Sequence, residues 1–527
     1  MLYNLNWLNP GTNFPPVGEK ERIKRYLENE VLFDGEHFGS ELRDRNKLYA
    51  NEGKISVYMK CAERISQVVG NFEDIISFPV LLNYQRLLSL KMADLVCGEY
   101  PTITGGNEEE NVALKTARDN SDFDARLYAT VIDMSRYGDA IWREYLDDMS
   151  DNKTFTLWDP KEWYPIVMQD GTNRISHHVL CWRVNLNAGV ENVFPEWELH
   201  VQIHGCSKDS WGKYEQRVYA MSTDGTVIQR LKSSAEVSTG FDHCAVHHLK
   251  SFGTSSTVYG YDDYMNLDSL LAEIMVRIGQ ISVILDKHAD PNLTGPASML
   301  SLNPETGEYY LKRGKFFATS QGDNEPHYLT WDGQLNAAFK QLETLLNQMY
   351  ILSEMGAAIL GGQDGSSAAI SGTAMRFKMV NPLAKARRIS NSLTNPVRRL
   401  LSALAENVKF EGVSVYWSDG LPDDPRENIE NAKLASGKEQ MMPLRVAIRE
   451  FFSRSDKEAD EWLKALEEDR LKTAKMNKPP EDPNHPGPQD GTGVNPSEKG
   501  SLIQACTDIE ELLSIHSQLH QRLLIQN

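Results

Sequence analysis

The stretch LDSLLAEIMVRIGQISVIL at residues 267–285 decides the fold class of this chain. Its apolar residues alternate spacings of four and three, at Leu267, Leu271, Ile274, Ile278, Ile281 and Leu285. This heptad-like seam predicts a helix over 263–286, roughly 24 residues and about 36 Å long at 1.5 Å per residue. Because Glu273 and Arg277 interrupt the apolar run, we expect no membrane span here.

A second long helix is predicted at 331–357, and a turn-rich insertion at 287–330 separates the two. Asp290-Pro291 and Gly295-Pro296 end the first helix, since proline cannot continue it. The second helix places five large apolar residues on one face: Leu335, Phe339, Leu342, Leu346 and Met349. Two long helices therefore flank a small insertion of strand-like pieces such as GEYYLKRGKFFATS.

The second helix leads into GGQDGSSAAISG at 361–372, where four glycines in twelve positions predict a mobile loop. A long helix follows from Thr373 to Asn407, which Pro382 and Pro396 should kink. A strand at Val413–Trp417 and charged helices at 426–474 come next. Six prolines and four glycines at 478–500 predict a linker before a last helix at 501–527.

The part of the chain before residue 263 combines helices with a strand-rich region. Amphipathic patterns predict helices at 19–33, 83–96 and about 121–136. Segments rich in Val, Ile, Trp and Tyr predict strands at Ala140–Tyr145, Thr154–Trp158, Ile175–Val184, Trp197–His204 and Gln216–Met221. Since strands and helices are segregated, the sequence predicts an α+β protein with several structural regions in its 527 residues.

The net charge of −19 argues against an ordinary DNA-binding domain, because phosphate neutralisation requires a basic surface. Nucleic acid is then either no partner or is handled without tight binding, as a channel that lets DNA slide would require. The six cysteines show no paired short spacing, which is typical of a reduced, intracellular protein without a disulfide framework. No basic stretch followed by an apolar run opens the chain, so a signal peptide is not expected.

Motifs for catalysis are absent from the sequence. No Gly-Lys-Ser/Thr ends a glycine-rich loop, and neither Gly-x-Ser-x-Gly nor His-Glu-x-x-His occurs. His243, Cys244, His247 and His248 crowd into six residues and are a metal candidate, as part of a hydrolase that uses His243, Cys244 and His247. In a strand, however, 243 and 247 share one face while 244 and 248 point away. The acidic pairs Asp147–Asp148, Asp262–Asp263 and Asp423–Asp424 could also hold a divalent ion, but such pairs are more often exposed turn residues. We therefore expect no metal, cofactor or catalytic residue.

Basic residues gather between 371 and 410, where eight positive charges stand against Glu406 alone. They are Arg376, Lys378, Lys385, Arg387, Arg388, Arg398, Arg399 and Lys409. This basic belt has two interpretations, either ion pairs and a solvated helix face, or contacts with DNA phosphates or an adjacent acidic subunit.

Several stretches, in this order, resemble the portal proteins of tailed bacteriophages, particularly those of siphophages. They are RYLENEVLFDGEHF (25–38), NYQRLLSLKMADLVCGEYPTIT (83–104), SRYGDAIWREY (135–145), WDPKEWYPIV (158–167), SEMGAAILGGQDGSSAAISGTAMRFKM (353–379) and VYWSDGLPDDPRENIE (415–430). The likeness extends over about residues 20–475. Another ring-forming head–tail connector is the structural alternative, but such proteins are usually much shorter.

The resemblance implies a portal fold with a β-rich wing, long stem helices, a small α/β clip, a tunnel loop and a helical crown. The regions it implies are a wing at 1–262 and 372–422, stem helices at 263–286 and 331–357, a clip at 287–330, a tunnel loop at 358–371, a crown at 423–475, a linker at 476–500 and a C-terminal helix at 501–527. Compared with the family pattern, the crown is short and the proline-rich linker is unusual.

The resemblance also implies a function and partners. The chain would form a homododecamer at one capsid vertex of the virion, assembled in the host bacterial cytoplasm, and conduct double-stranded DNA. Its partners would be the terminase large subunit, the major capsid and scaffolding proteins and the head–tail adaptor. The expected DNA-channel residues are Gln363, Asp364, Ser366 and Ser367, with Lys385, Arg387 and Arg388 in the basic belt. Lys312, Arg313 and Lys315 are expected to dock partners at the clip.

Overall fold

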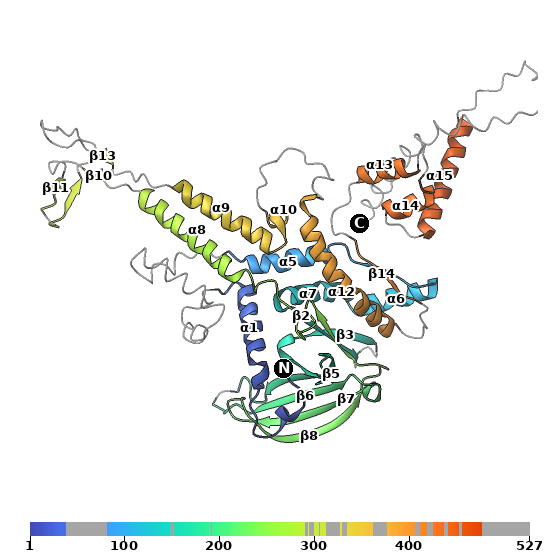
Figure 1. The fold of residues 1–527 in the computed structure, drawn as a ribbon, viewed down its shortest axis with the longest axis horizontal. Coiled ribbons are helices and arrows are strands. Elements are labelled where there is room, and N and C mark those ends of the chain that lie inside the picture. Colours follow the sequence, from blue (N-terminus) through green and yellow to red (C-terminus); the bar gives the residue numbers. More distant parts are fainter. Residues whose placement is uncertain are drawn as a thin grey trace, which may run out of the picture. The chain divides into compact units, whose positions relative to one another are not determined.

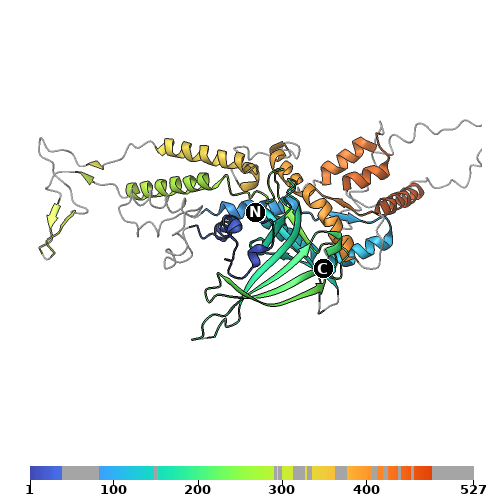
Figure 2. The same cartoon turned by 60° about the horizontal axis from the view of Figure 1, so that its bottom comes forward.

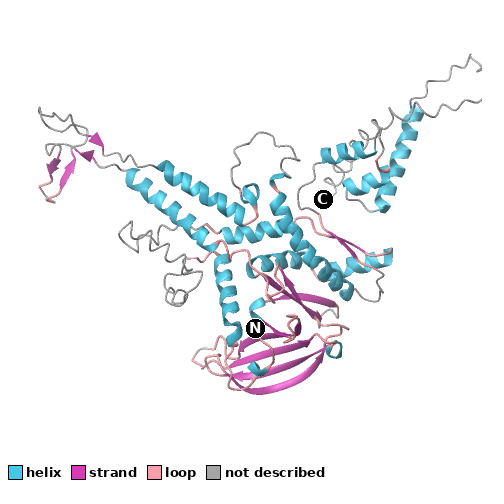
Figure 3. Cartoon of the chain, viewed as in Figure 1, coloured by secondary structure: helices cyan, strands magenta, loops and turns pink. Residues whose placement is uncertain are grey.

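The computed structural model describes residues 1–37, 82–147, 149, 152–190, 192–289, 293–294, 300–304, 306–311, 327–328, 335–361, 377–405, 412–418, 425–436, 441–452 and 456–476. The structure is mixed helix and sheet, as expected, and most of its strand residues lie between residues 139 and 250 (Figure 3). The chain forms two compact units, Met1–Ile370 with Ala374–Gly420, and Ser371–Thr373 with Leu421–Asn527. Among the described helices, none carries an apolar stretch sufficient to cross a bilayer.

The helices of the first unit confirm most of the sequence predictions (Figure 1). They are α1 (Lys20–Asp34), α5 (Tyr84–Cys97), α6 (Glu108–Asn120), α7 (Phe123–Tyr137), α8 (Asp268–Ala289), α9 (Leu335–Leu352), α10 (Gly356–Leu360) and α12 (Val380–Leu404). Helix α6 was not predicted, although its N-terminus carries a capping motif. The Asn107 side chain accepts from the Glu110 amide at 2.9 Å, and Glu110 accepts from the Gly106 amide at 2.8 Å.

Two antiparallel sheets form the β-rich part of the first unit. The larger has the order β4-β5-β6-β7-β8, with β4 (Trp163–Val167), β5 (Ile175–Asn185), β6 (Trp197–Gly205), β7 (Lys213–Met221) and β8 (Ile228–Ser238). The smaller has the order β3-β2-β9, with β3 (Lys153–Trp158), β2 (Asp139–Leu146) and β9 (Val246–Lys250). Edge strand β8 was not predicted because most of its side chains are exposed and polar.

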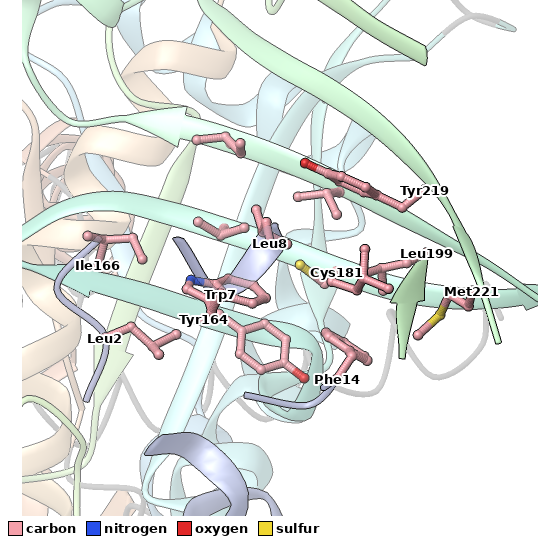
Figure 4. Close-up of a cluster of buried hydrophobic side chains, with 14 residues drawn as sticks. Leu2, Trp7, Leu8, Phe14, Tyr164, Ile166, Cys181, Leu199, Tyr219 and Met221 are labelled. Carbon is pink, nitrogen blue, oxygen red and sulfur yellow. The ribbon is translucent and has the colours of Figure 1, made fainter. Parts of the chain in front are cut away.

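One face of the larger sheet packs against the first residues of the chain (Figure 4). Leu2 forms an isolated parallel β-bridge with Ile166 of β4, and Trp7, Leu8 and Phe14 pack into a cluster of buried side chains. The cluster takes its sheet residues from alternate positions of the strands, including Val179, Cys181, Leu199, Val201 and Ile203. This alternation is the pattern that a sheet with one apolar face requires.

The smaller sheet lies between α7 and the other face of the larger sheet. The Trp142 indole donates to Thr130 on α7 at 2.8 Å, and Trp142 packs edge-on against Phe155. On the opposite face, Ile141 and Val246 pack with Trp163 and Leu180 of the larger sheet. Figure 2 shows the strands of the larger sheet curving beneath these elements. The two sheets and α7 therefore form successive layers.

Helix α1 is positioned by a buried arginine that was not predicted from the sequence. The Arg22 guanidinium donates to Glu19 and to the carbonyl oxygens of Pro160 and Trp163, each at 2.7 Å. Its plane also lies over the Tyr259 ring, 4.9 Å from the centroid. Because every side of the cation is paired or stacked, its burial is compensated.

Short pairs of strands occur outside the two large sheets. Strand β1 (Thr102–Thr104) pairs with β14 (Ser414–Tyr416), which confirms the strand predicted at 413–417. In the predicted insertion, β10 (Leu293–Thr294) pairs with β13 (His327–Tyr328), and β11 (Leu300–Leu302) pairs with β12 (Tyr309–Leu311).

The charged helical region expected at 426–474 lies in the second unit and consists of three helices. They are α13 (Pro425–Ser436), α14 (Leu444–Phe452) and α15 (Asp456–Met476). Arg445 on α14 donates to both carboxylate oxygens of Asp460 on α15, at 2.6 and 2.9 Å. The predicted linker beyond residue 476 and the predicted helix at 501–527 lie outside the described residues.

Candidate functional site: the long helices and their base

Helices α8 and α9 run side by side, as both ribbon views show (Figures 1 and 2). The predicted seam of α8 is buried at Leu271, Ile274 and Ile281. Its last member, Leu285, is 47% exposed. An ion pair of 2.8 Å between Arg277 and Glu273 places the two interrupting charges one helical turn apart. The first half of α8 is therefore packed within the chain, while its far end keeps an apolar residue in solvent.

Helix α9 leaves three of its large apolar side chains exposed. Among its side chains that the structure describes, only Met349 is buried. Phe339, Ile351 and Leu352 are 47%, 63% and 53% exposed. At about 100° of rotation per residue, Phe339 and Ile351 project from different sides of the helix. A single packing partner therefore does not cover α9 on all its apolar sides.

The base of both long helices is joined to α12 by one buried lysine. Nζ of Lys385 lies 2.8 Å from Oδ1 of Asp263, which precedes α8, and donates to the Ser353 carbonyl at 3.1 Å, directly after α9. Asp263 also accepts from the Ser135 hydroxyl at 2.6 Å. The Lys385 side chain thus connects α8, α9 and α12. No pattern in the sequence distinguished Lys385 from the other basic residues near it.

The basic belt is split by the packing of α12. Lys385 is 8% exposed and serves the pair with Asp263, so it does not present a free charge to DNA. Arg387 and Arg388 lie on the exposed side, where Arg388 pairs with Glu354. Within the described part of the chain, no ion pair involves Arg387, Arg398 or Arg399. The sequence analysis grouped all these residues in one belt because the sequence of this helix does not show which of its sides is buried.

Helix α12 is shorter than predicted and treats its two prolines differently. It begins at Val380, so Pro382 falls in the first turn, where a missing N–H costs nothing. Pro396 lies inside the helix and removes one i to i−4 hydrogen bond. Thr394, close to this gap, accepts a hydrogen bond from the Trp417 indole at 2.9 Å, which links α12 to the residues after β14.

The side chains of the histidine-rich stretch at 243–248 fall into separate groups, as the interpretation of this stretch as a strand predicts. His243 and His247 meet at Glu144, whereas His248 contacts Asp139 at 2.6 Å. Cys244 groups with Cys206 and His178 instead. The set His243, Cys244 and His247 proposed for a hydrolase is therefore wrong, because Cys244 lies outside the group that the two histidines form.

The remaining predicted contact residues are not located by the structure. Gln363, Asp364, Ser366 and Ser367 of the tunnel loop lie outside the described residues, and so do Lys312, Arg313 and Lys315 of the clip. Their roles stay predictions.

Comparison with known protein families covers α9, one of the two long helices, but not α8. Residues 301–471 match the model of a family described as phage portal protein, SPP1 Gp6-like. No curated protein matches the sequence. Solved structures with weak likeness include a chain from the neck of an empty gene transfer agent particle, with 11% identity and a TM-score of 0.37 over 67% of this chain and 84% of that one.

A second such structure is a chain from the virion of a native gene transfer agent particle. It has 11% identity and a TM-score of 0.40 over 74% of this chain and 89% of that one. Both scores are too low to establish a shared fold. The family match covers α9, α12 and the charged helices. It supports the resemblance that the sequence indicates: residues 301–471 are similar to phage portal proteins of the SPP1 Gp6-like type.

Proposed function

We propose that this chain is the subunit of a closed ring, a homododecamer at one capsid vertex, through which double-stranded DNA enters and leaves the virion. The observation that carries the proposal is the uncovered apolar surface of α9, at Phe339, Ile351 and Leu352. Exposed apolar surface of this kind marks an interface between proteins. Because these residues project from different sides, the helix needs more than one neighbour, and a subunit in a closed ring has one on each side.

The charge of the chain suits a channel in which DNA slides. Twelve chains at −19 each offer phosphate few attractive contacts, so binding stays weak except at local basic positions. Arg387 and Arg388 on the exposed side of α12 are the candidates of this kind, while Lys385 is engaged at the base of the long helices. Weak contact lets DNA move in both directions.

The chain supplies a passage and docking surfaces, without a catalytic step. Since the sequence has no nucleotide-binding loop, the force for packaging comes from a partner, the large terminase subunit. The clip, with Lys312, Arg313 and Lys315, would dock the terminase and later the head–tail adaptor. Capsid and scaffolding proteins surround the ring as the particle assembles in the bacterial cytoplasm.

The glycine-rich loop provides a test that separates DNA passage from ring assembly. Removing residues 361–368 deletes Gln363, Asp364, Ser366 and Ser367, the residues proposed to line the channel. We expect rings of normal appearance by negative-stain microscopy and a large loss of packaged DNA in a phage packaging assay. A matched control replaces 361–368 with a Gly/Ser stretch of equal length and should retain more packaging. Normal packaging by the deletion variant would contradict the assignment of this loop.

A further inference from the structure

A glutamate and two histidines from separate segments converge beside the smaller sheet of the first unit. Nε2 of His243 lies 2.5 Å from Oε2 of Glu144, and Nε2 of His247 lies 2.9 Å from Oε1 of the same carboxylate. One ligand atom from each residue lies within 4.8 Å of the other two. We propose that Glu144, His243 and His247 bind a divalent transition metal, with zinc as the fitting ion.

The strand register explains how the three residues meet. Glu144 lies in β2, and the Glu144 amide donates to the Ala245 carbonyl at 2.8 Å just before β9. In the same pairing Trp142 lies opposite His247, so His247 and Glu144 fall on one face of the sheet. His243 approaches from the segment that connects β8 to β9. The positions are thus set by backbone pairing, which a metal site requires.

The chemistry of the group matches zinc. Two imidazole nitrogens and one carboxylate are a ligand set that binds zinc and leaves a fourth position open. The Glu144 side chain has no exposure, whereas those of His243 and His247 are 26% and 19% exposed, so the group is reachable from solvent on one side. A buried carboxylate needs a cation beside it, and a bound metal ion would supply one.

The surroundings of His243 also fit a ligand. A metal-bound histidine normally donates its second ring N–H to a carboxylate or carbonyl, which fixes the ring. Nδ1 of His243 lies 3.1 Å from the carboxylate of Asp242, so Asp242 can accept this proton while Nε2 keeps a free lone pair for the metal. The side chain of Asp242 is fully exposed, which makes it a mild position to change.

A second group, His178 with Cys206 and Cys244, lies nearby and fits less well. The Trp163 indole N–H donates to Nδ1 of His178 at 3.0 Å. Nδ1 therefore keeps its lone pair for this bond, and in the neutral ring the proton sits on Nε2, which then cannot ligate. Variants of Cys206 and Cys244 therefore serve as controls, since changing these cysteines should leave metal binding at Glu144 intact.

A metal bound by Glu144 and His243 would link the segment between β8 and β9 to strand β2. It would thereby tie the end of the larger sheet to the smaller sheet and stabilise the β-rich part of the unit. This role is structural, and it does not depend on the proposed channel function.

The test measures zinc in the full-length protein purified with zinc and then dialysed. We expect about one zinc ion per chain by elemental mass spectrometry in the wild type and in the double variant Cys206→Ser, Cys244→Ser. His243→Gln and His247→Gln should each lose it, and His177→Gln, at a histidine outside both groups, should keep it. Asp242→Asn should retain the ion with affinity weakened about tenfold in a chelator competition.

Circular dichroism provides the fold control for the histidine variants. Thermal unfolding should shift downward when a chelator is added to the wild type, and the variants should already unfold at the lower temperature. Wild-type protein that retains no zinc would overturn the proposal and leave Glu144 held only by its contacts with the two histidines. Zinc that persists in both histidine variants and is lost in the cysteine variant would overturn it as well. If the histidine variants fail to fold, the cysteine variant still decides, since loss of zinc in that variant would contradict the proposal.

Discussion

Lys385 connects the base of both long helices to α12, and its replacement tests the importance of this pair. Replacing it with Met keeps most of the aliphatic side chain and leaves Asp263, whose side chain is 9% exposed, without its cation. Removing one partner of a buried ion pair costs about 3–5 kcal/mol. We therefore expect Lys385→Met to lower the free energy of unfolding by about 3 kcal/mol in urea titration.

The matched control for Lys385 is the exposed Arg387 on the same helix. Arg387→Met should change the free energy of unfolding by less than about 0.5 kcal/mol, as surface substitutions usually do. Equal losses in the two variants would show that the Lys385 pair adds no stability beyond an ordinary helix residue.

His204 makes stability depend on pH in a known direction. Burial lowers its pKa from 6.5 to about 3, so the folded chain keeps His204 neutral where the unfolded chain takes up a proton. The resulting stability is present above about pH 6.5 and is lost as the pH falls toward 3. Between pH 7 and pH 5 the loss from this residue is about 2 kcal/mol.

The measurement compares the wild type with His204→Gln by urea unfolding at pH 7 and at pH 5. The stability of the variant should fall by about 2 kcal/mol less than that of the wild type over this interval. Parallel pH curves for the two proteins would mean that His204 titrates normally in the folded state.

Residues such as Lys385 and Glu144 show what the sequence does not reveal about sites. The sequence identified the crowded histidines, but Glu144 lies 99 and 103 positions away from them, and only strand pairing brings it near. Lys385 was one of eight basic residues between 371 and 410. Its role differs from that of Arg387 because Lys385 is buried, which the sequence does not show. Contacts between residues far apart in the sequence depend on tertiary packing, and local sequence patterns do not predict them.

The start of β2 passes very close to the loop before α8, and two glycines permit this approach. A Cβ on Gly260 would lie 2.0 Å from the Gly138 carbonyl oxygen, so Gly260→Ala must push two backbone segments apart. We expect the variant to lose at least about 1–3 kcal/mol of stability, the range for overpacking. Gly412→Ala is the control, because nothing lies within 4 Å of its added Cβ, and it should be neutral. Equal unfolding midpoints in denaturant would contradict this close packing.

Helix α9 should mediate association rather than stabilise the single chain. A triple change of Phe339, Ile351 and Leu352 to Ser removes exposed apolar groups, so the fold of one chain should persist. We expect the variant to lose ring assembly, which size-exclusion chromatography with light scattering would show.

The control for α9 changes Gln341, Asn347 and Gln348 to Ser, three exposed polar positions on the same helix. This variant should assemble like the wild type. If both triple variants form rings, the contacts between subunits lie elsewhere in the chain.

Helices and strands with a clear apolar periodicity were predicted well. Those without one, which depend on packing against neighbouring elements, were missed. Helix α8 has its seam in the sequence, and its observed bounds of Asp268–Ala289 lie close to the expected 263–286. Edge strand β8 escaped prediction because its polar, exposed residues have no alternation to detect. Helix α6 escaped because its charged sequence forms a broken apolar face, although Asn107 caps it.

The whole molecule combines a well-packed β-rich region with long helices that one chain leaves partly uncovered. The clusters around Trp163 and Trp142 and the buried Arg22 stabilise the first region internally. Phe339, Ile351 and Leu352 of α9 have no comparable cover in the described chain. This contrast is what a ring subunit requires, a stable body with an unsatisfied surface toward its neighbours.

The mass of the assembled protein by native mass spectrometry tests the ring directly. Twelve chains of 59.6 kDa predict a closed species of about 715 kDa, with a central hole in negative-stain images. A homogeneous species at the mass of one or two chains, unchanged across salt and protein concentration, would contradict the account.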